Sequence, residues 1–221
     1  MLGVSTGLDK MTLYINALYQ KSGFDREKYV ETTELKRFGA LVDEDVSRML
    51  QILVRLTQAK RILEIGTSIG YSTLSMAKGM KDHGGKIVTI EIDRQVARQA
   101  RKNFARAGFA ENIEVKIGDA LEIIPQIQEE FDLIFQDVGD KRLYSILLDH
   151  CVRLLKPCGL LLAEDSLLSS AKMSANNHDR IDGHNIIPEI QRFNEMVANC
   201  PSLESTILPI GDGLTVAVKI G

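Results

Sequence analysis

The sequence predicts one α/β domain over residues 1–221: a seven-stranded, mostly parallel sheet, helices on both faces and an antiparallel C-terminal hairpin. Three observations predict this fold. From Arg61 onward, short apolar runs alternate with segments of helical spacing. The runs are nearly continuously apolar, as expected for strands that are covered on both sides. Only a tight turn separates the last two runs, which makes that pair antiparallel.

The composition is typical of a globular protein with one core. The chain has 221 residues, of which 44% are hydrophobic, and a net charge of -3, so no overall attraction to nucleic acid or anionic membrane is expected. No apolar run approaches the roughly 20 residues needed to span a bilayer. Cys151, Cys158 and Cys200 lack C-x-x-C spacing and are predicted to be reduced core thiols. Since no secretion signal is visible either, we expect a cytoplasmic protein.

The elements follow in order. Residues 1–57 form a predicted helical extension that has no catalytic signature. Five strands are then predicted at 61–65, 86–92, 113–117, 131–136 and 159–164, with helices between them at 72–80, 94–108, 120–128 and 142–156. The polar insert 169–185 has the length of a substrate lid. A helix over 186–200 precedes the two hairpin strands, 203–210 and 211–220, whose turn contains Pro209, Gly211 and Gly213.

The first strand ends in "EIGTSIGYSTL", at the end of the sheet where such folds bind ligands. Gly66 and Gly70 permit a tight turn and a close approach to a ligand. Ser72 lies at the start of the next helix, where free backbone N–H groups favour an anion. The spacing E-x-G-x-x-x-G differs from the G-x-G-x-x-G of dinucleotide binders, which argues against a nicotinamide oxidoreductase. A purely structural turn remains the alternative.

The next two strands also end in polar residues. Glu91 ends the second strand, where a carboxylate can accept both hydroxyls of a ribose. Asp119 and Ala120 follow the third strand and could bind and flank an adenine; Asp119 could also cap the next helix. Together the three strand ends predict a nucleoside site.

At this point the sequence resembles the S-adenosylmethionine-dependent O-methyltransferases of the catechol and caffeoyl-CoA type. "LEIGTSIGYSTLSMA" resembles their first motif and "LPIGDGLTVAVK" their last strands, and the likeness runs from Val42 to the C-terminus. The resemblance implies a Rossmann-like methyltransferase fold that binds S-adenosylmethionine. Glu64 and Gly66 would lie around its methionine moiety, with Ser72 at the carboxylate. Gly70 and Tyr71 of the same motif would also belong to the cofactor site. Glu91 would bind the ribose, and Asp119 with Ala120 the adenine.

Three carboxylates follow the fourth and fifth strands, which we expect to be neighbours: Asp137, Glu164 and Asp165. Unpaired, these acids would raise one another's pKa, and a divalent cation would relieve the repulsion. Ligands that are all oxygen favour Mg²⁺, Ca²⁺ or Mn²⁺. The resemblance implies the same three ligands, with a carboxylate at Asp165 where the family has an amide, and Ser166 where it often has Thr. The alternative is a strand-to-helix cap in which Asp165 or Ser166 bonds backbone N–H groups.

The resemblance also implies a mechanism, with Asp137 at the reacting centre. In the catechol enzymes a lysine three residues after the first metal-binding Asp takes the proton from the acceptor hydroxyl. That position is Asp140 here, and the neighbouring Lys141 is our candidate base; a surface lysine is the alternative. The acceptor would be a small molecule with adjacent hydroxyls, and a homodimer is expected by resemblance.

Two further features of the sequence keep other functions open. A basic stripe lies on the helix over 94–108, made of Arg94, Arg98, Arg101, Lys102 and Arg106. It is predicted to be a solvated face, but it would also suit a methyltransferase that acts on hydroxyuridine in tRNA. A cofactor-binding module without turnover is the alternative outside the enzymes. His178, Asp179, Asp182 and His184 are predicted to belong to the lid rather than to a zinc site.

Overall fold

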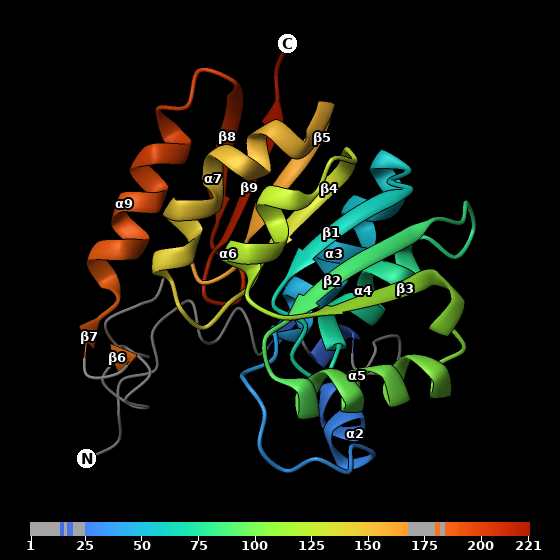
Figure 1. The fold of residues 1–221 in the computed structure, drawn as a ribbon. Helices are drawn as coiled ribbons and strands as arrows, with labels where there is room; N and C mark the ends of the chain where they lie inside the picture. The colour runs from blue at the N-terminus through green and yellow to red at the C-terminus, as the bar shows by residue number, and fades with distance from the viewer. Residues whose placement is uncertain (1–13, 16, 20–24, 168–179, 182–183) are drawn as a thin grey trace.

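The computed structural model describes residues 14–15, 17–19, 25–167, 180–181 and 184–221. Within them, a seven-stranded sheet has the order β3-β2-β1-β4-β5-β9-β8 (Figure 1). Its strands are β1 (Arg61–Ile65), β2 (Lys86–Glu91), β3 (Ile113–Ile117), β4 (Phe131–Gln136), β5 (Leu155–Ala163), β8 (Leu203–Leu208) and β9 (Leu214–Lys219). β1 to β5 pair in parallel, and β9 lies antiparallel between β5 and β8. The predicted sheet and hairpin are confirmed.

Helices cover both faces of this sheet. The helices are α2 (Arg26–Glu31), α3 (Glu44–Thr57), α4 (Tyr71–Gly79), α5 (Arg94–Arg106), α6 (Ala120–Ile123), α7 (Arg142–Leu154) and α9 (Ile187–Ala198), with 3-10 turns η1 (Ala110–Asn112) and η2 (Ile124–Gln126). One core packs α3, α4 and α5 on the sheet, and the other packs α6, α7 and α9 on the opposite face. β6 (Arg180–Ile181) and β7 (His184–Asn185) form a separate two-stranded pair.

The apolar strands are buried on both sides, as their sequences predict. In β1, Ile62 faces the core beneath α3, α4 and α5, while Leu63 faces the core beneath α7 and α9, and both are fully buried. Successive side chains of a strand point to opposite faces, so a strand with no solvent-exposed face needs apolar residues throughout. This arrangement leaves the carboxyl ends of the strands as the place for polar side chains.

Two predicted boundaries are wrong, and a proline accounts for each. The predicted helix 120–128 breaks into α6 and η2 at Pro125, and α7 stops at Leu154 because the residue before Pro157 avoids helical geometry. β5 therefore begins four residues earlier than the predicted strand at 159. Cys158 lies in this irregular start of β5 with φ 62° and is exposed, so its assignment as a core thiol is wrong; Cys151 is buried and Cys200 half-buried.

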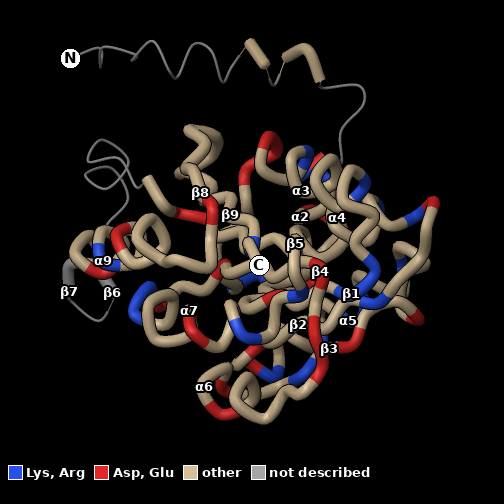
Figure 2. The backbone as a smooth tube through the Cα atoms, turned by 90° about the horizontal axis from the view of Figure 1, so that it is seen from above, with Lys and Arg blue, Asp and Glu red and all other residues tan. Residues whose placement is uncertain are grey.

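The predicted lid at 169–185 lies mostly outside the described residues, and so does the start of the predicted helical extension over 1–57. Residues 14–15 and 17–19 are helical, and α3 matches the helix expected near the end of the N-terminal extension. Figure 2 shows acidic and basic residues interspersed along the backbone. Within the described ranges, no helix has both the length and the apolar character required to cross a membrane.

Candidate active site

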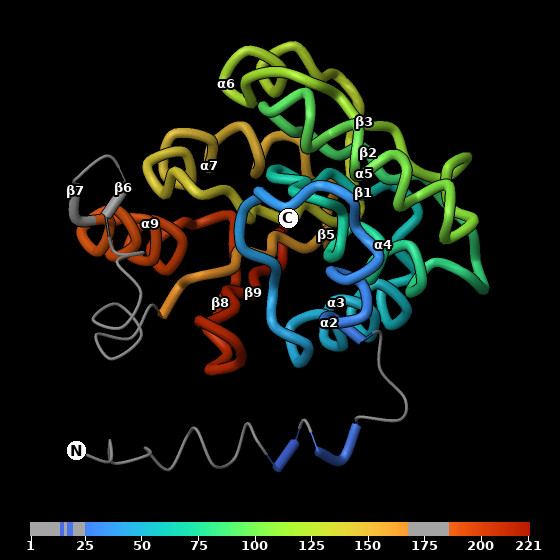
Figure 3. Tube along the Cα trace, turned by 90° about the horizontal axis from the view of Figure 1, so that it is seen from below, coloured from blue at the N-terminus to red at the C-terminus, as the bar shows by residue number. Residues whose placement is uncertain are grey.

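The carboxyl ends of β1 to β5 open onto a cavity of about 600 Å³. Its walls are loop residues after each of these strands, together with a segment from the N-terminal part of the chain, residues 37–40. Figure 3 looks onto this end of the sheet and shows the chain between α2 and α3 passing across it. Sequence reasoning missed this wall, because nothing in "RFGA" signals which part of the sheet it will cover. The Ser68 hydroxyl donates to the carbonyl of Gly39 at 3.3 Å and so ties the segment to the glycine loop.

Glu91 lies on the cavity wall in a fixed orientation. Its carboxylate accepts backbone N–H groups from Ser68 at 2.8 Å and from Asp93 at 2.9 Å. Burial raises the pKa of Glu91, while these two hydrogen bonds act in the opposite direction. Because the backbone holds the carboxylate, its remaining lone pairs face the cavity in a defined position, as a ribose site requires.

Asp119 and Ala120 also line the cavity. Asp119 is the N-cap of α6, and its carboxylate accepts the N–H of Leu121 at 2.8 Å. The capping role considered for Asp119 is therefore confirmed. It is compatible with an adenine contact, because a carboxylate has further lone pairs on the cavity side.

Gly66 allows the glycine loop to pack directly on the loop after β4. Its φ is 98°, and a Cβ atom at this position would lie 2.0 Å from the carbonyl oxygen of Asp137. Gly70, with φ 90°, caps α4 where a Cβ would lie 2.2 Å from the ring of Phe104. Both glycines are thus required by close contacts as well as by backbone conformation.

Replacing Gly66 with alanine is expected to destabilise the protein by about 2 kcal/mol or more, because positive φ and overlap with a backbone oxygen act together. Urea denaturation measures the effect. Gly139→Ala is the matched control, since a Cβ there would have no neighbour within 4 Å; its change should stay within about 0.5 kcal/mol. Equal destabilisation by the two substitutions would contradict this account of the glycine loop.

Glu64 is fully buried in a network of hydroxyl groups. Its carboxylate accepts hydrogen bonds from Ser72 at 2.6 Å, from Thr89 at 2.6 Å and from Thr73. Thr89 also lies 2.6 Å from the hydroxyl of Thr67. Sequence reasoning missed this network, because Thr89 reaches Glu64 only through the pairing of β1 with β2. Burial raises the pKa of Glu64 to about 7 despite these donors.

The titration of Glu64 predicts a pH dependence of stability. A carboxyl group whose folded pKa lies above its unfolded value stabilises the fold at low pH, and this contribution is lost as pH rises through the folded pKa. The difference in unfolding free energy between the wild type and Glu64→Gln should therefore fall between about pH 4.5 and 7, by roughly 3 kcal/mol at most, and then level off. Denaturation series at several pH values measure it. If this difference in unfolding free energy did not vary with pH, the raised pKa of Glu64 would be contradicted.

Several residues of the first motif lie behind the cavity wall. Tyr71 and Ser72 are buried, and Tyr71 packs its ring 5.4 Å from that of Tyr29. Glu64, Gly70, Tyr71 and Ser72 are not among the described residues that line the cavity, whereas Gly66 is. Their contact with a cofactor stays a prediction.

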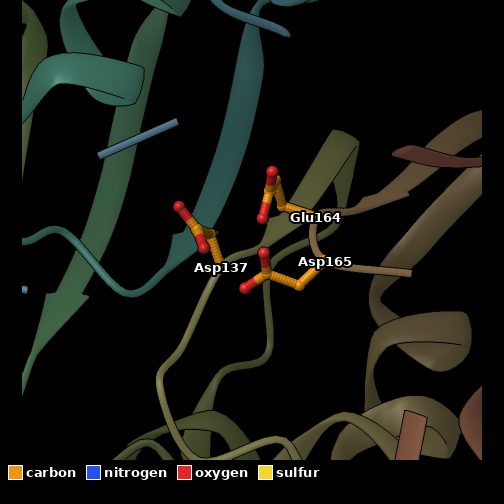
Figure 4. Close-up of side chains that lie close together, drawn as sticks. All are labelled: Asp137, Glu164 and Asp165. Carbon is orange, nitrogen blue, oxygen red and sulfur yellow. The ribbon is translucent and has the colours of Figure 1, made fainter. Parts of the chain in front are cut away.

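The three acids after β4 and β5 do converge. One carboxylate oxygen each of Asp137, Glu164 and Asp165 lies within 4.8 Å of the other two (Figure 4). β4 and β5 are adjacent in the sheet, so their ends place the three side chains together. Burial raises the pKa of Asp137 to about 7 and that of Glu164 well above its usual range, and repulsion from Asp165 adds to both effects. We call these three residues the acid cluster.

Lys141 lies beside the acid cluster and is buried. Its Nζ is 2.5 Å from Oδ2 of Asp165, donates to the Tyr144 hydroxyl at 2.9 Å and sits 4.5 Å from the centre of the Tyr144 ring. Its exposed fraction of 3% contradicts the surface-lysine alternative. Asp140, which stands at the position of the lysine in the catechol enzymes, pairs instead with Arg142 at 2.5 Å.

The charge of Lys141 follows from its neighbours. Burial alone would lower the pKa of this lysine, but the adjacent Tyr144 hydroxyl and the carboxylates of the acid cluster outweigh burial and raise it. Lys141 is therefore an ammonium group in this structure. Tyr144 was missed from the sequence, although it lies one helical turn from Lys141 and hydrogen-bonds the carbonyl of Gln136.

The acid cluster fits a divalent cation. All its donor atoms are oxygens, which suit hard ions, and a cation would relieve the repulsion from Asp165 that adds to the raised pKa of Asp137 and of Glu164. The contacts of Ser166 differ from those of the strand-to-helix cap, in which a side chain accepts backbone N–H groups: its hydroxyl donates to the carbonyl of Ala163 and lies 2.7 Å from the hydroxyl of Thr215. Asp165 has φ 61° and directs its carboxylate to Lys141.

Three of the five side chains in the basic stripe on α5 bond to other segments of the protein. Arg101 donates to the carbonyl of Val115 at 2.7 Å, Lys102 pairs with Glu34 at 2.6 Å and Arg106 donates to the carbonyl of Thr32 at 2.6 Å. These bonds fix β3 and the chain after α2 to α5. The side chains of the possible zinc ligands at 178, 179, 182 and 184 lie outside the described residues.

A glycine turn after β1, an acid after β2 and Asp-Ala after β3, around one cavity of a seven-stranded sheet with an antiparallel hairpin, define a Rossmann-like methyltransferase. The profile of a family described as O-methyltransferase matches residues 25–220. The chain belongs to this family and is an S-adenosylmethionine-dependent O-methyltransferase that acts on hydroxyl acceptors.

Individual relatives agree with this assignment. A catechol O-methyltransferase of Niastella koreensis is 35% identical over 189 residues, which cover 80% of this chain and 81% of the relative. Caffeoyl-CoA O-methyltransferase 1 of Eucalyptus globulus is 30% identical over 182 residues, covering 80% and 73%. The crystal structure of the O-methyltransferase TomG from Streptomyces achromogenes, in complex with S-adenosylmethionine (SAM), superposes with a TM-score of 0.75 at 26% identity and covers 96% of each chain.

Proposed function

We propose that this enzyme methylates one of two adjacent hydroxyls on a small catechol-like acceptor, with the help of a divalent cation held by the acid cluster. The observation that carries the proposal is the convergence of Asp137, Glu164 and Asp165, two of which, Asp137 and Asp165, line the cavity. The names of the relatives support the acceptor class, since catechol and caffeoyl groups both carry adjacent hydroxyls. When bound, a divalent cation such as Mg²⁺ would lower the pKa of a hydroxyl that it coordinates.

The protein's own residues would orient the reaction. Glu91 would accept the ribose hydroxyls, Asp119 and Ala120 would hold the adenine, and the glycine loop at Gly66 would leave room for the methionine moiety. Asp137 borders the cavity and belongs to the acid cluster, so it would lie where cofactor and acceptor meet. Holding the acceptor oxygen in line with the sulfonium methyl group can supply about 7–11 kcal/mol of the barrier.

Lys141 would take the proton of the acceptor hydroxyl. It is the cation nearest the acid cluster among the described residues, and it lines the cavity. Because the acids hold its proton in this structure, Lys141 can act as a base only when their charge is neutralised. The extra carboxylate at Asp165, where relatives of this type are expected to have an amide, strengthens that requirement.

The test is an assay of methyl transfer from SAM to a panel of catechols, with Mg²⁺ and with EDTA. We expect methylated product with Mg²⁺ and a loss of turnover with EDTA that added Mg²⁺ restores. Product that forms equally well in EDTA would remove the cation from the mechanism. Cofactor binding without any product would support a module without turnover, and salt-sensitive methylation of tRNA alone would support the RNA enzyme.

We also propose a homodimer in the cytoplasm. Large apolar side chains are exposed near the N-terminal end, including Tyr14 at 65%, Leu18 at 59% and Leu56 at 76%. A dimer that brings these side chains together would remove their apolar surface from water. Light scattering coupled to size-exclusion chromatography measures the mass in solution, and a monomer at micromolar concentration would contradict the dimer.

A further inference from the structure

Ser166, directly after the acid cluster, is held on every polar atom. It is 2% exposed, and its N–H donates to the carbonyl of Gly213 at 2.9 Å. Its hydroxyl donates to the carbonyl of Ala163 at 3.1 Å and lies 2.7 Å from the hydroxyl of Thr215. Its carbonyl accepts a hydrogen bond from Nδ2 of Asn194 at 2.8 Å. Four separate contacts therefore fix one residue.

The anchoring of Ser166 matters because the residue before it, Asp165, has an unfavourable backbone conformation. Its φ of 61° is in the left-handed region, which side chains other than glycine rarely adopt. Leu167, the residue after Ser166, is also fixed, since its N–H donates to the carbonyl of Asp212 at 2.8 Å. A left-handed residue persists when its surroundings hold it in place. The contacts to Ser166 and Leu167 hold the turn that directs Asp165 toward Lys141.

The side chains that anchor Ser166 come from elements outside the acid cluster. Thr215 lies on β9, paired in register with Ala163 at the end of β5, and it is 2% exposed. Asn194 lies on α9. Neither residue is among the described residues that line the cavity. Among the hydrogen bonds of the described residues, each is linked to the acids through Ser166, so each would affect a bound ion by fixing the geometry of the cluster.

We propose that Thr215 and Asn194 are positioning residues that set the orientation of Asp165, and thereby the cation affinity of the acid cluster. This inference rests on the proposed function in one respect, namely that a divalent cation binds there. It assigns to the C-terminal hairpin and to α9 a part in the reaction in addition to their packing role. Groups that orient the ligands of a metal are often needed for its binding.

The experiment compares Thr215→Val, which keeps the shape but removes the hydroxyl, with Thr215→Ser, which restores it. Titration of the full-length protein with Mn²⁺ should show affinity about 10–100-fold weaker for Thr215→Val and recovery in Thr215→Ser. Binding of S-adenosylhomocysteine should stay within about two-fold, because Thr215 is not among the described residues that line the cavity. Thr33→Val is the matched control, since this threonine is also buried and its hydroxyl is also hydrogen-bonded within the protein, to the carbonyl of Tyr29 at 3.0 Å.

A second measurement needs no metal. Lys141 is buried against Asp165, so an amine-reactive acetyl ester should label it several-fold faster in Thr215→Val than in the wild type, as detected by mass spectrometry. Lys156, paired with Asp132 at 2.6 Å, is the internal reference and should not change. If the Thr215→Val protein does not fold, Asn194→Asp takes its place in both measurements, because this substitution removes the donor to Ser166.

The two measurements separate the inference from the proposed function. If the wild type binds Mn²⁺ and the Thr215→Val protein binds it equally well, the positioning role is overturned. If the wild type binds no Mn²⁺, the proposed cation site is contradicted, and the labelling of Lys141 alone tests the positioning role. Faster labelling in Thr215→Val then supports that role, and unchanged labelling overturns it.

Discussion

Replacing Asp137 with alanine is expected to lower kcat/KM for methyl transfer by about 10³-fold or more, because the variant would lose a ligand of the proposed cation, which would acidify the acceptor hydroxyl and position it. Asp137 is the one member of the acid cluster that follows β4, so its loss leaves only the adjacent pair after β5. Steady-state assays with Mg²⁺ measure the change. The melting temperature without metal should not fall, since the substitution removes one of three like charges.

The control for this variant is Asp149→Ala. Asp149 is an exposed acid on α7, outside the cavity and the acid cluster, and its replacement should leave kcat/KM unchanged. An Asp137→Ala protein that retains most of its metal-dependent activity would show that the acid cluster does not serve the reaction. A large fall in melting temperature would instead assign Asp137 to the fold.

Replacing Lys141 with alanine should reduce kcat by about 10²–10⁴-fold, the usual contribution of a general base. Affinity for the cofactor should stay within about two-fold, because Lys141 contacts Asp165 and Tyr144 rather than the ends of β2 and β3. Isothermal titration with S-adenosylhomocysteine and assays of initial rate measure the two quantities separately.

Lys156→Ala provides a matched control for this substitution. Lys156 forms a comparable ion pair with Asp132, at 2.6 Å, near the opposite ends of β4 and β5. Its loss should reduce stability slightly and leave kcat intact. An unchanged kcat in Lys141→Ala would remove this lysine from the mechanism and leave it as a counter-ion of the acids.

The sequence was sufficient for the sheet and for the strand ends that carry the site. Apolar runs and their polar exits are local patterns, so Glu91, Asp119 and Asp137 can be assigned to the ends of their strands from the order of residues alone. The convergence of Asp137 with Glu164 and Asp165 could also be predicted, since the fourth and fifth strands were expected to be neighbours, and they are.

What the sequence did not reveal depends on contacts between distant segments. Thr89 joins the Glu64 network through strand pairing, and residues 37–40 reach the cavity from across the chain. Thr215 and Asn194 meet Ser166 only after the hairpin and α9 have packed. The burial of Lys141 is of the same kind, because the acids that draw it inward follow different strands.

The most direct test of the acid cluster is a crystal structure of the protein with S-adenosylhomocysteine and Mn²⁺, with anomalous scattering used to locate the ion. We predict one Mn²⁺ peak bound by oxygens of Asp137, Glu164 and Asp165, beside the sulfur of the cofactor product, with Lys141 no longer paired to Asp165. A fully occupied cofactor site without a Mn²⁺ peak among these three carboxylates would contradict the proposed chemistry.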